Sequence, residues 1–286
     1  MKSSRPLLLV FLFAIVLSPA VAATETTVRP GKFAWVDLVT TDPDAAIAFY
    51  TQTFGWTAQE ASGGRQRYTF LLNQGRPVAG VAYRRADSDR TGTAGARWVG
   101  SIAVADIDAA VKAVAAAGGR VVVTPRKIQG RGIQALVADP EGCLFGLITR
   151  EAGGNADDDA VENEWVWAQL LSGKPATAIE FYRKALGYQV DEDTRSKRPD
   201  DYLLSRDGYS CAGLTPLPEG KGTHAGWVGY LRVADIEETI GAAKELGGRV
   251  LYLQEAPDRL RVAILADPLG GAVGIVSMPA AKEDGK

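Results

Sequence analysis

The chain carries the same stretch of sequence twice, and this duplication constrains its fold more than any other feature. Residues 34–50, AWVDLVTTDPDAAIAFY, return as residues 166–182, VWAQLLSGKPATAIEFY. Later markers keep the same order, because WVG…VADI, GGRV and ADPxG each occur once per repeat. A repeat of this length is one structural unit, so we predict two homologous domains joined in tandem.

Each repeat is itself divided into two halves that begin with a strand-like segment followed by a helix. The helices are predicted from apolar residues at helical spacing and from chemical stop signals. Asp42-Pro43 is typical of a helix start, and Gly55, Gly118 and Gly247 stand where helices should end. The apolar stripes are Ile47, Tyr50 and Phe54; Ile179, Tyr182 and Leu186; and Ile107, Val111 and Val114.

Short β-branched or apolar segments bounded by Gly, Pro or Asp follow the helices and predict strands. Examples are Arg120–Thr124, Gln134–Ala138 and Leu144–Thr149. Each half is then a β-α-β-β-β module, and two modules must join to cover the sheet face opposite each helix, which leaves a cupped surface between them. The predicted fold class is therefore α+β, with two tandem domains of two paired modules each.

The first 22 residues are typical of a secretory signal peptide. A charged start precedes an unbroken apolar run over Leu7–Leu17, and small residues surround a cleavage site near Ala22. The run is shorter than the roughly 20 residues that a membrane span needs, although an uncleaved anchor is the alternative. We predict a periplasmic or extracellular protein without a stable membrane span after cleavage.

Residues 31–150 and 163–278 are the predicted domains, and the Gly-rich, acidic segment 151–162 is the predicted linker. The net charge is −2 with both signs scattered along the chain, which argues against a nucleic-acid partner. Cys143 and Cys211 do not occupy equivalent positions in the two repeats. We expect buried thiols here rather than a disulfide.

These motifs resemble the vicinal-oxygen-chelate superfamily, which includes glyoxalase I, extradiol dioxygenases and bleomycin-binding proteins. The resemblance is carried by DPDAAIAFY…FGW and ATAIEFYRKALGY, by VADID and VADIE, and by ADPEG and ADPLG. It implies two glyoxalase/dioxygenase-like domains. Two such domains in one chain can pair as separate subunits do in single-domain relatives, so a monomer is plausible.

The resemblance implies a divalent metal in the cup, held by side chains on the first and fifth strands and on the fourth or eighth strand of a domain. Carried over, those positions fall on residues that cannot bind a metal, and the lone histidine, His224, precedes a strand in a loop. Asp37 and Gln169 would supply one ligand each if the register were shifted along the strand. We expect no metal and no other cofactor. The carried-over positions are Trp35, Val99 and Gly146 in the first repeat, and Trp167, Val228 and Gly274 in the second.

Strand alternation indicates which side chains line the cups. Phe33, Trp35, Asp37 and Val39 should share one face of a strand, as should Trp165, Trp167, Gln169 and Leu171. Asp37 would favour a cation or a hydroxyl, and Tyr230 with Arg232 would favour a carboxylate or phenolate. The alternative is that the tryptophans plug a vestigial cavity. The predicted ligand-binding residues are Trp35, Asp37, Ser101, Trp167, Gln169, Tyr230 and Arg232.

These observations favour an exported protein that binds a small, partly apolar organic molecule without the family's metal. A metal-dependent lyase, isomerase or dioxygenase is the alternative, as is acid–base chemistry by residues such as Asp37 with Tyr230. A third hypothesis is an interaction scaffold with filled cups. No catalytic triad, Cys-x-x-Cys pair or phosphate-binding glycine loop points to another class of enzyme.

Overall fold

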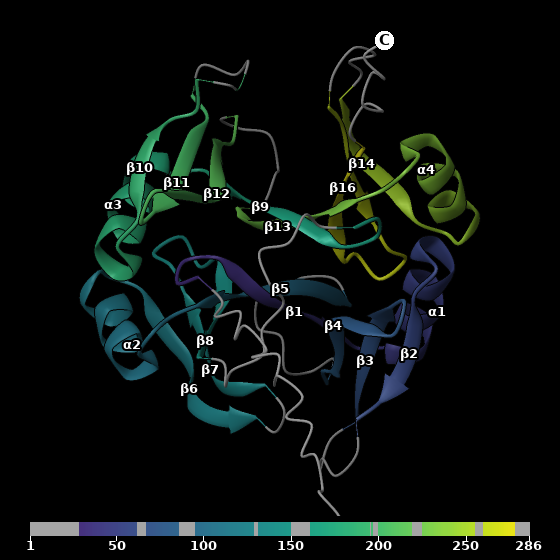
Figure 1. Ribbon diagram of the computed structural model, residues 1–286, viewed down its shortest axis with the longest axis horizontal. Coiled ribbons are helices and arrows are strands. Elements are labelled where there is room, and N and C mark those ends of the chain that lie inside the picture. The colour runs from purple at the N-terminus through teal and green to yellow at the C-terminus, as the bar shows by residue number, and fades with distance from the viewer. Residues whose placement is uncertain are drawn as a thin grey trace, which may run out of the picture.

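The computed structural model gives each repeat one eight-stranded sheet and two helices (Figure 1). The structure describes residues 29–61, 67–85, 95–128, 131–149, 161–194, 196, 200–218, 225–254 and 260–277. The first repeat comprises β1 (Phe33–Thr40), α1 (Pro43–Phe54), β2 (Thr57–Glu60), β3 (Tyr68–Asn73), β4 (Arg76–Tyr83), β5 (Ala96–Ala103), α2 (Ile107–Ala116), β6 (Arg120–Ile128), β7 (Gly132–Ala138) and β8 (Leu144–Thr149). The second comprises β9 (Trp165–Ser172), α3 (Pro175–Leu186), β10 (Gln189–Glu192), β11 (Tyr202–Arg206), β12 (Tyr209–Pro216), β13 (Gly226–Arg232), α4 (Ile236–Glu245), β14 (Arg249–Gln254), β15 (Arg261–Ala266) and β16 (Ala272–Ser277).

This order confirms the predicted β-α-β-β-β modules and the α+β class. The strand order is β2-β3-β4-β1-β5-β8-β7-β6 in the first sheet and β10-β11-β12-β9-β13-β16-β15-β14 in the second. Within a module the first strand pairs in parallel with the last, and the two modules of a sheet join where their first strands pair antiparallel. The modules therefore lie side by side in one sheet and do not cover each other face to face.

The helix limits have the chemical causes expected from the sequence. The carboxylate of Asp42 accepts the backbone N–H of Ala45 at 3.0 Å, and Pro43 occupies the first turn of α1. α1 ends at Gly55, whose φ of 67° is a left-handed conformation that glycine adopts without strain. Asp106 and Asp235 cap α2 and α4 in the same way as Asp42.

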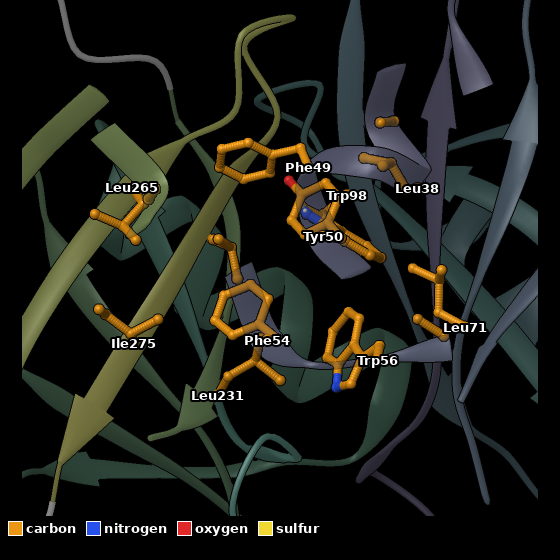
Figure 2. Close-up of a cluster of buried hydrophobic side chains, with 14 of the residues drawn as sticks. Leu38, Phe49, Tyr50, Phe54, Trp56, Leu71, Trp98, Leu231, Leu265 and Ile275 are labelled. Atoms are coloured by element: carbon orange, nitrogen blue, oxygen red, sulfur yellow. Dashed lines mark hydrogen bonds between the residues drawn. The ribbon is translucent and has the colours of Figure 1, made fainter. Parts of the chain in front are cut away.

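The two sheets pack back to back, with their concave faces pointing away from each other (Figure 1). α1 lies beside α4 on one flank, and α2 lies beside α3 on the other. Each of the two hydrophobic cores joins the first module of one repeat to the second module of the other. In Figure 2, rings from α1 and the adjacent Trp56 lie between leucines of the first sheet and Leu231, Leu265 and Ile275 of the second.

Both cysteines are buried free thiols, as expected. Within the described ranges, no helix has the length and apolar character needed to cross a bilayer. The predicted signal peptide, residues 151–160 of the predicted linker, and His224 lie outside the described residues.

Candidate functional site

The concave faces of the two sheets are called cup 1, in the first repeat, and cup 2, in the second. Their floors are rows of residues paired across neighbouring strands. One row of cup 1 runs through Trp35, Ser101, Gly146, Leu136 and Val123. The equivalent row of cup 2 runs through Trp167, Tyr230, Gly274, Ile264 and Tyr252.

A β-bulge corrects the predicted faces of β1 and β9. The register shifts between Phe33 and Trp35, so Phe33 leaves the cup face and packs edge-on against Trp227 at a centroid distance of 4.9 Å. The same shift in β9 turns Trp165 toward Trp98 and Trp56 in the core between the repeats. Simple alternation fails here because a bulge inserts one residue and reverses every earlier side chain.

Asp37 is the centre of a compact polar cluster in cup 1. Its carboxylate accepts hydrogen bonds from Arg131 at 2.7 and 3.0 Å, from the Tyr68 hydroxyl at 2.6 Å and from the Trp35 indole at 3.0 Å. Glycine at position 80 leaves room for this cluster, because an added Cβ would lie 1.6 Å from the Tyr68 hydroxyl. The guanidinium of Arg131 also lies over the rings of Tyr68 and Trp35, at 4.6 and 5.5 Å.

This cluster alters the role that the sequence predicted for Asp37. The cation that the carboxylate attracts is Arg131 of the same chain, and the side chains of Arg131 and Asp37 are only 9% and 17% exposed. Burial, followed by the nearby Asp37 charge, raises the pKa of Tyr68, so its phenol stays protonated and donates to Asp37. Ser101, the other predicted residue of cup 1, is buried at 4% exposure.

Two of the predicted residues of cup 2, Trp167 and Gln169, begin a chain of hydrogen bonds along the floor. The Trp167 indole donates to Gln169 Oε1 at 2.8 Å, and Gln169 Nε2 donates to Thr215 Oγ1 at 2.9 Å. Thr215 in turn donates to the Asp201 carboxylate at 2.7 Å. A Cβ at Gly213 would lie 2.1 Å from Gln169 Oε1, so glycine at this position lets the amide lie flat on the sheet.

The remaining floor of cup 2 is aromatic and partly exposed. Trp167 and Tyr230 are half-buried, and Tyr252 at the outer strand is 44% exposed. Burial, followed by the neighbouring Tyr252 and Asp201, raises the pKa of Tyr230 to about 12, so this phenol is neutral at physiological pH. Arg232 lies two residues beyond Tyr230 on the same strand, paired with Val276.

The residues present do not fit the family's divalent metal. The row that contains Trp35 and Gly146 offers an indole, a hydroxyl and a glycine, and Val99 belongs to the next row beside Asp37. Cup 2 offers Trp167, Tyr230 and Gly274 at the same places. Asp37, the one carboxylate on β1, is already paired with Arg131. No group of three or more His, Cys, Asp or Glu side chains that could hold a metal occurs among the described residues.

The structure also separates a pair that the sequence left open as acid and base. Asp37 lies on the first sheet and Tyr230 on the second, and the two cups face in opposite directions (Figure 1). The two groups therefore cannot act on one substrate molecule.

Sequence reasoning missed Arg131 and Tyr68 in cup 1, and Thr215, Asp201 and Tyr252 in cup 2. Tyr68 in the first repeat and Asp201 in the second stand at equivalent positions. Each lies beside the last strand of the first module, which is β4 or β12. Alignment of the two repeats at this strand would have revealed that pair. Arg131 lies in the turn before β7, and no pattern in the sequence indicates that its side chain reaches β1.

The comparisons with known proteins agree with this architecture. Residues 32–147 match the model of the Glyoxalase/Bleomycin resistance protein/Dioxygenase superfamily, and residues 167–276 match that of a Glyoxalase-like domain. The chain is 33% identical to the anthracycline biosynthesis protein DauV of Streptomyces sp. (strain C5) over 264 residues, which cover 88% of this chain and 95% of that protein.

Two solved structures share the fold at low sequence identity. The Mn(II)-bound glyoxalase from Novosphingobium aromaticivorans superposes with a TM-score of 0.59 at 18% identity, over 87% of this chain and 82% of that one. The 2,2',3-trihydroxybiphenyl 1,2-dioxygenase from Sphingomonas wittichii strain RW1 gives 0.58 at 13% identity, over 90% and 94%. The chain thus belongs to the glyoxalase/bleomycin resistance protein/dioxygenase superfamily and carries two tandem domains of that family.

Proposed function

We propose that the protein binds a small, partly apolar organic molecule on the concave face of its sheets, without the divalent metal of its family. The observation that carries this proposal is the floor of cup 2. Three aromatic residues of its row, Trp167, Tyr230 and Tyr252, remain partly exposed on a sheet whose other face packs into the two hydrophobic cores. Exposed aromatic rings beside a few fixed polar groups suit a small organic ligand.

The donor chemistry supports binding that does not depend on a metal. A transition metal needs three or four N, O or S side chains that converge on one point. The indole of Trp167, the neutral phenol of Tyr230 and the absent side chain of Gly274 offer no such set. The polar groups of the floor are hydrogen-bond donors and acceptors, which recognise hydroxyl and carbonyl groups directly.

The names of the relatives suggest a class of ligand. DauV, and a similar protein of Streptomyces peucetius at 32% identity, are named as anthracycline biosynthesis proteins. Anthracyclines are built on planar fused rings with hydroxyl and carbonyl groups, which match aromatic rings and amides in a binding site. We extend the proposal to fused-ring aromatics of this kind.

We also propose a location and an oligomeric state for the protein. The charged start, the apolar run Leu7–Leu17 and the small residues around Ala22 support export and cleavage near Ala22. The back-to-back packing of the two repeats already covers the helix-bearing face of each sheet, which supports a monomer. Intact mass and light scattering of protein recovered from the periplasm of a bacterial host test both points.

The test of binding uses the purified mature protein and three probes. These are 1,4-dihydroxyanthraquinone, 2-naphthol and benzoate, followed by quenching of tryptophan fluorescence and by thermal shift. We expect saturable binding of at least one fused-ring probe, unchanged after prolonged chelator treatment. No binding of any probe would refute the proposal. So would binding that needs added Mn²⁺, Zn²⁺ or Fe²⁺, or one tightly held metal ion per domain by elemental analysis.

A further inference from the structure

We propose that the two cups have diverged in use: cup 1 is closed by its own Arg131–Asp37 ion pair, and cup 2 alone holds ligand, with a hydroxyl group of a planar ring bound at the Gln169 amide. This inference rests on the proposed function and adds to it the location, the stoichiometry and the recognised group. It predicts one ligand per chain although the chain contains two domains of one family.

Cup 1 is closed from within by side chains of its own strands and turns. Arg131 extends from the turn before β7 to Asp37 on β1, and its guanidinium covers the Trp35 and Tyr68 rings. Trp35, which lies beneath the guanidinium, is 7% exposed, and Ser101, its partner on the neighbouring strand, is 4% exposed. A ligand would have to displace a buried ion pair to reach either residue, and leaving one buried charge unpaired is costly.

Cup 2 replaces that ion pair with a neutral amide. The position of Asp37 on β1 is taken by Gln169 on β9, because each pairs with the equivalent valine of the neighbouring strand, Val99 or Val228. The carboxylate of cup 2 is instead Asp201, which is held by Thr215. The side chain at this position of β9 is therefore uncharged in cup 2.

The amide of Gln169 has hydrogen-bonding capacity to spare. A glutamine amide has two N–H donors and two acceptor lone pairs. The Trp167 indole uses one lone pair of Oε1, and Thr215 uses one N–H of Nε2. One donor and one acceptor remain, and their orientation is fixed by those two contacts. A hydroxyl group both donates and accepts, so it can pair with the remaining donor or with the remaining acceptor, whereas a carboxylate can pair only with the donor.

The aromatic row beside Gln169 sets the shape of the ligand. Tyr230 lies on β13 and Tyr252 on β14. The two strands between them, β16 and β15, contribute Gly274 and Ile264 to the same row. Three strand spacings of about 4.8 Å place the two tyrosine positions up to about 14 Å apart along the sheet. A planar ring whose hydroxyl group pairs with the Gln169 amide lies against Trp167 and Tyr230, the two aromatic residues of the row nearest that amide.

Two equivalent glycines supply a matched pair of variants. A methyl group at Gly213 would displace the Gln169 amide, and a methyl group at Gly80 would displace the Tyr68 hydroxyl in cup 1. The probes are 2,6-dihydroxyanthraquinone, whose hydroxyl groups are remote from its carbonyls and free to donate, and 9,10-anthraquinone, which lacks the hydroxyl groups. We expect wild-type protein to bind one dihydroxyanthraquinone per chain, at least tenfold more tightly than anthraquinone. Gly213→Ala should lose most of this preference, and Gly80→Ala should keep wild-type affinity within twofold.

The melting temperature of Gly213→Ala shows whether this variant folds. If it does not, Gln169→Leu replaces it, and we expect the same loss of preference for the dihydroxyanthraquinone. Hydroxyl-radical footprinting of the free protein should oxidise Trp167 faster than Trp35, and bound probe should protect Trp167 and Tyr230 only. Two ligands per chain, equal loss from both glycine variants, or protection of Trp35 would overturn this inference while the proposed function stands. Failure of every probe to bind would overturn both.

Discussion

The phenol of Tyr50 donates a hydrogen bond of 3.0 Å to the carboxylate of Asp267, 217 residues further along the chain. The equivalent contact runs from the second repeat to the first, because Tyr182 donates to the carboxylate of Asp139 at 3.2 Å. Each tyrosine also accepts from a tryptophan indole, Trp98 or Trp227. The FY, WVG and ADP markers that reveal the duplication in the sequence thus meet at the interface between the repeats.

These two relays should make similar and separable contributions to stability. Tyr50→Phe removes a hydrogen bond to a buried carboxylate and leaves the Trp98 N–H without its acceptor. We expect each of Tyr50→Phe and Tyr182→Phe to lower the free energy of unfolding by about 1.5–3 kcal/mol. The relays lie on opposite flanks, so the double variant should show the sum. Urea denaturation measures this, with exposed Tyr83→Phe as a control. Full wild-type stability in both single variants would contradict the relay.

The same carboxylates predict how stability depends on pH. Burial raises the pKa of Asp139 and Asp267 above the ordinary value of 3.8, although backbone N–H donors oppose the shift. The folded state then takes up these protons at higher pH than the unfolded chain. The resulting stabilisation is fully present below pH 3.8 and is lost as the pH rises through the raised folded values.

Asn mimics the protonated carboxyl, so Asp139→Asn/Asp267→Asn should gain stability relative to wild type as the pH rises from about 3.5 to 7. Urea denaturation over that range measures the difference. Asp44 and Glu180, whose pKa values are lowered by Arg67 and Lys184, are present in both proteins and cancel in this comparison. If wild type instead gained stability relative to the double variant as the pH rises, the pKa values of Asp139 and Asp267 would not be raised by folding.

The fold could be predicted from the sequence because its determinants are local and occur in duplicate. Asp42, Pro43 and Gly55 define α1 through short-range chemistry, and the second repeat supplies an independent copy of the pattern. The faces of β1 and β9 could not be predicted fully, because one extra residue in a bulge leaves no mark on alternation.

The candidate site was predicted less completely than the fold. Asp37, Trp35, Gln169 and Tyr230 do lie on the cup floors, since they follow the strand period. The partner that decides the role of Asp37 is Arg131, which is 94 residues away and belongs to a turn. Periodicity carries no information on such a long-range contact, so only the three-dimensional structure reveals that Arg131 neutralises the Asp37 carboxylate in cup 1.

The Arg131–Asp37 pair should be necessary to the fold of cup 1. Arg131→Gln leaves a carboxylate that is 17% exposed without its cation, and we expect a loss of about 3–5 kcal/mol in the free energy of unfolding. Asp37→Asn/Arg131→Gln removes both charges and should recover most of that loss. Chemical denaturation of wild type, Arg131→Gln, Asp37→Asn and the double variant gives the coupling energy. Arg67→Gln, which breaks an exposed ion pair with Asp44, is the control and should show no resolvable change. Equal effects of the buried and exposed substitutions would show that Arg131 is not essential.

Close packing between the repeats at Gly248 provides the last test. A Cβ there would lie 2.8 Å from the Ala243 carbonyl oxygen and 2.9 Å from the Phe49 ring of the other repeat. The backbone cannot yield cheaply, so Gly248→Ala should lower the free energy of unfolding by about 1–3 kcal/mol. Gly241, inside α4, has no neighbouring atom within 4 Å of an added Cβ. Gly241→Ala should therefore raise stability by roughly 0.5–1 kcal/mol through helix propensity. Calorimetric unfolding of both variants distinguishes the sites, and a stabilised Gly248→Ala would mean that α1 of the first repeat does not press on the turn after α4.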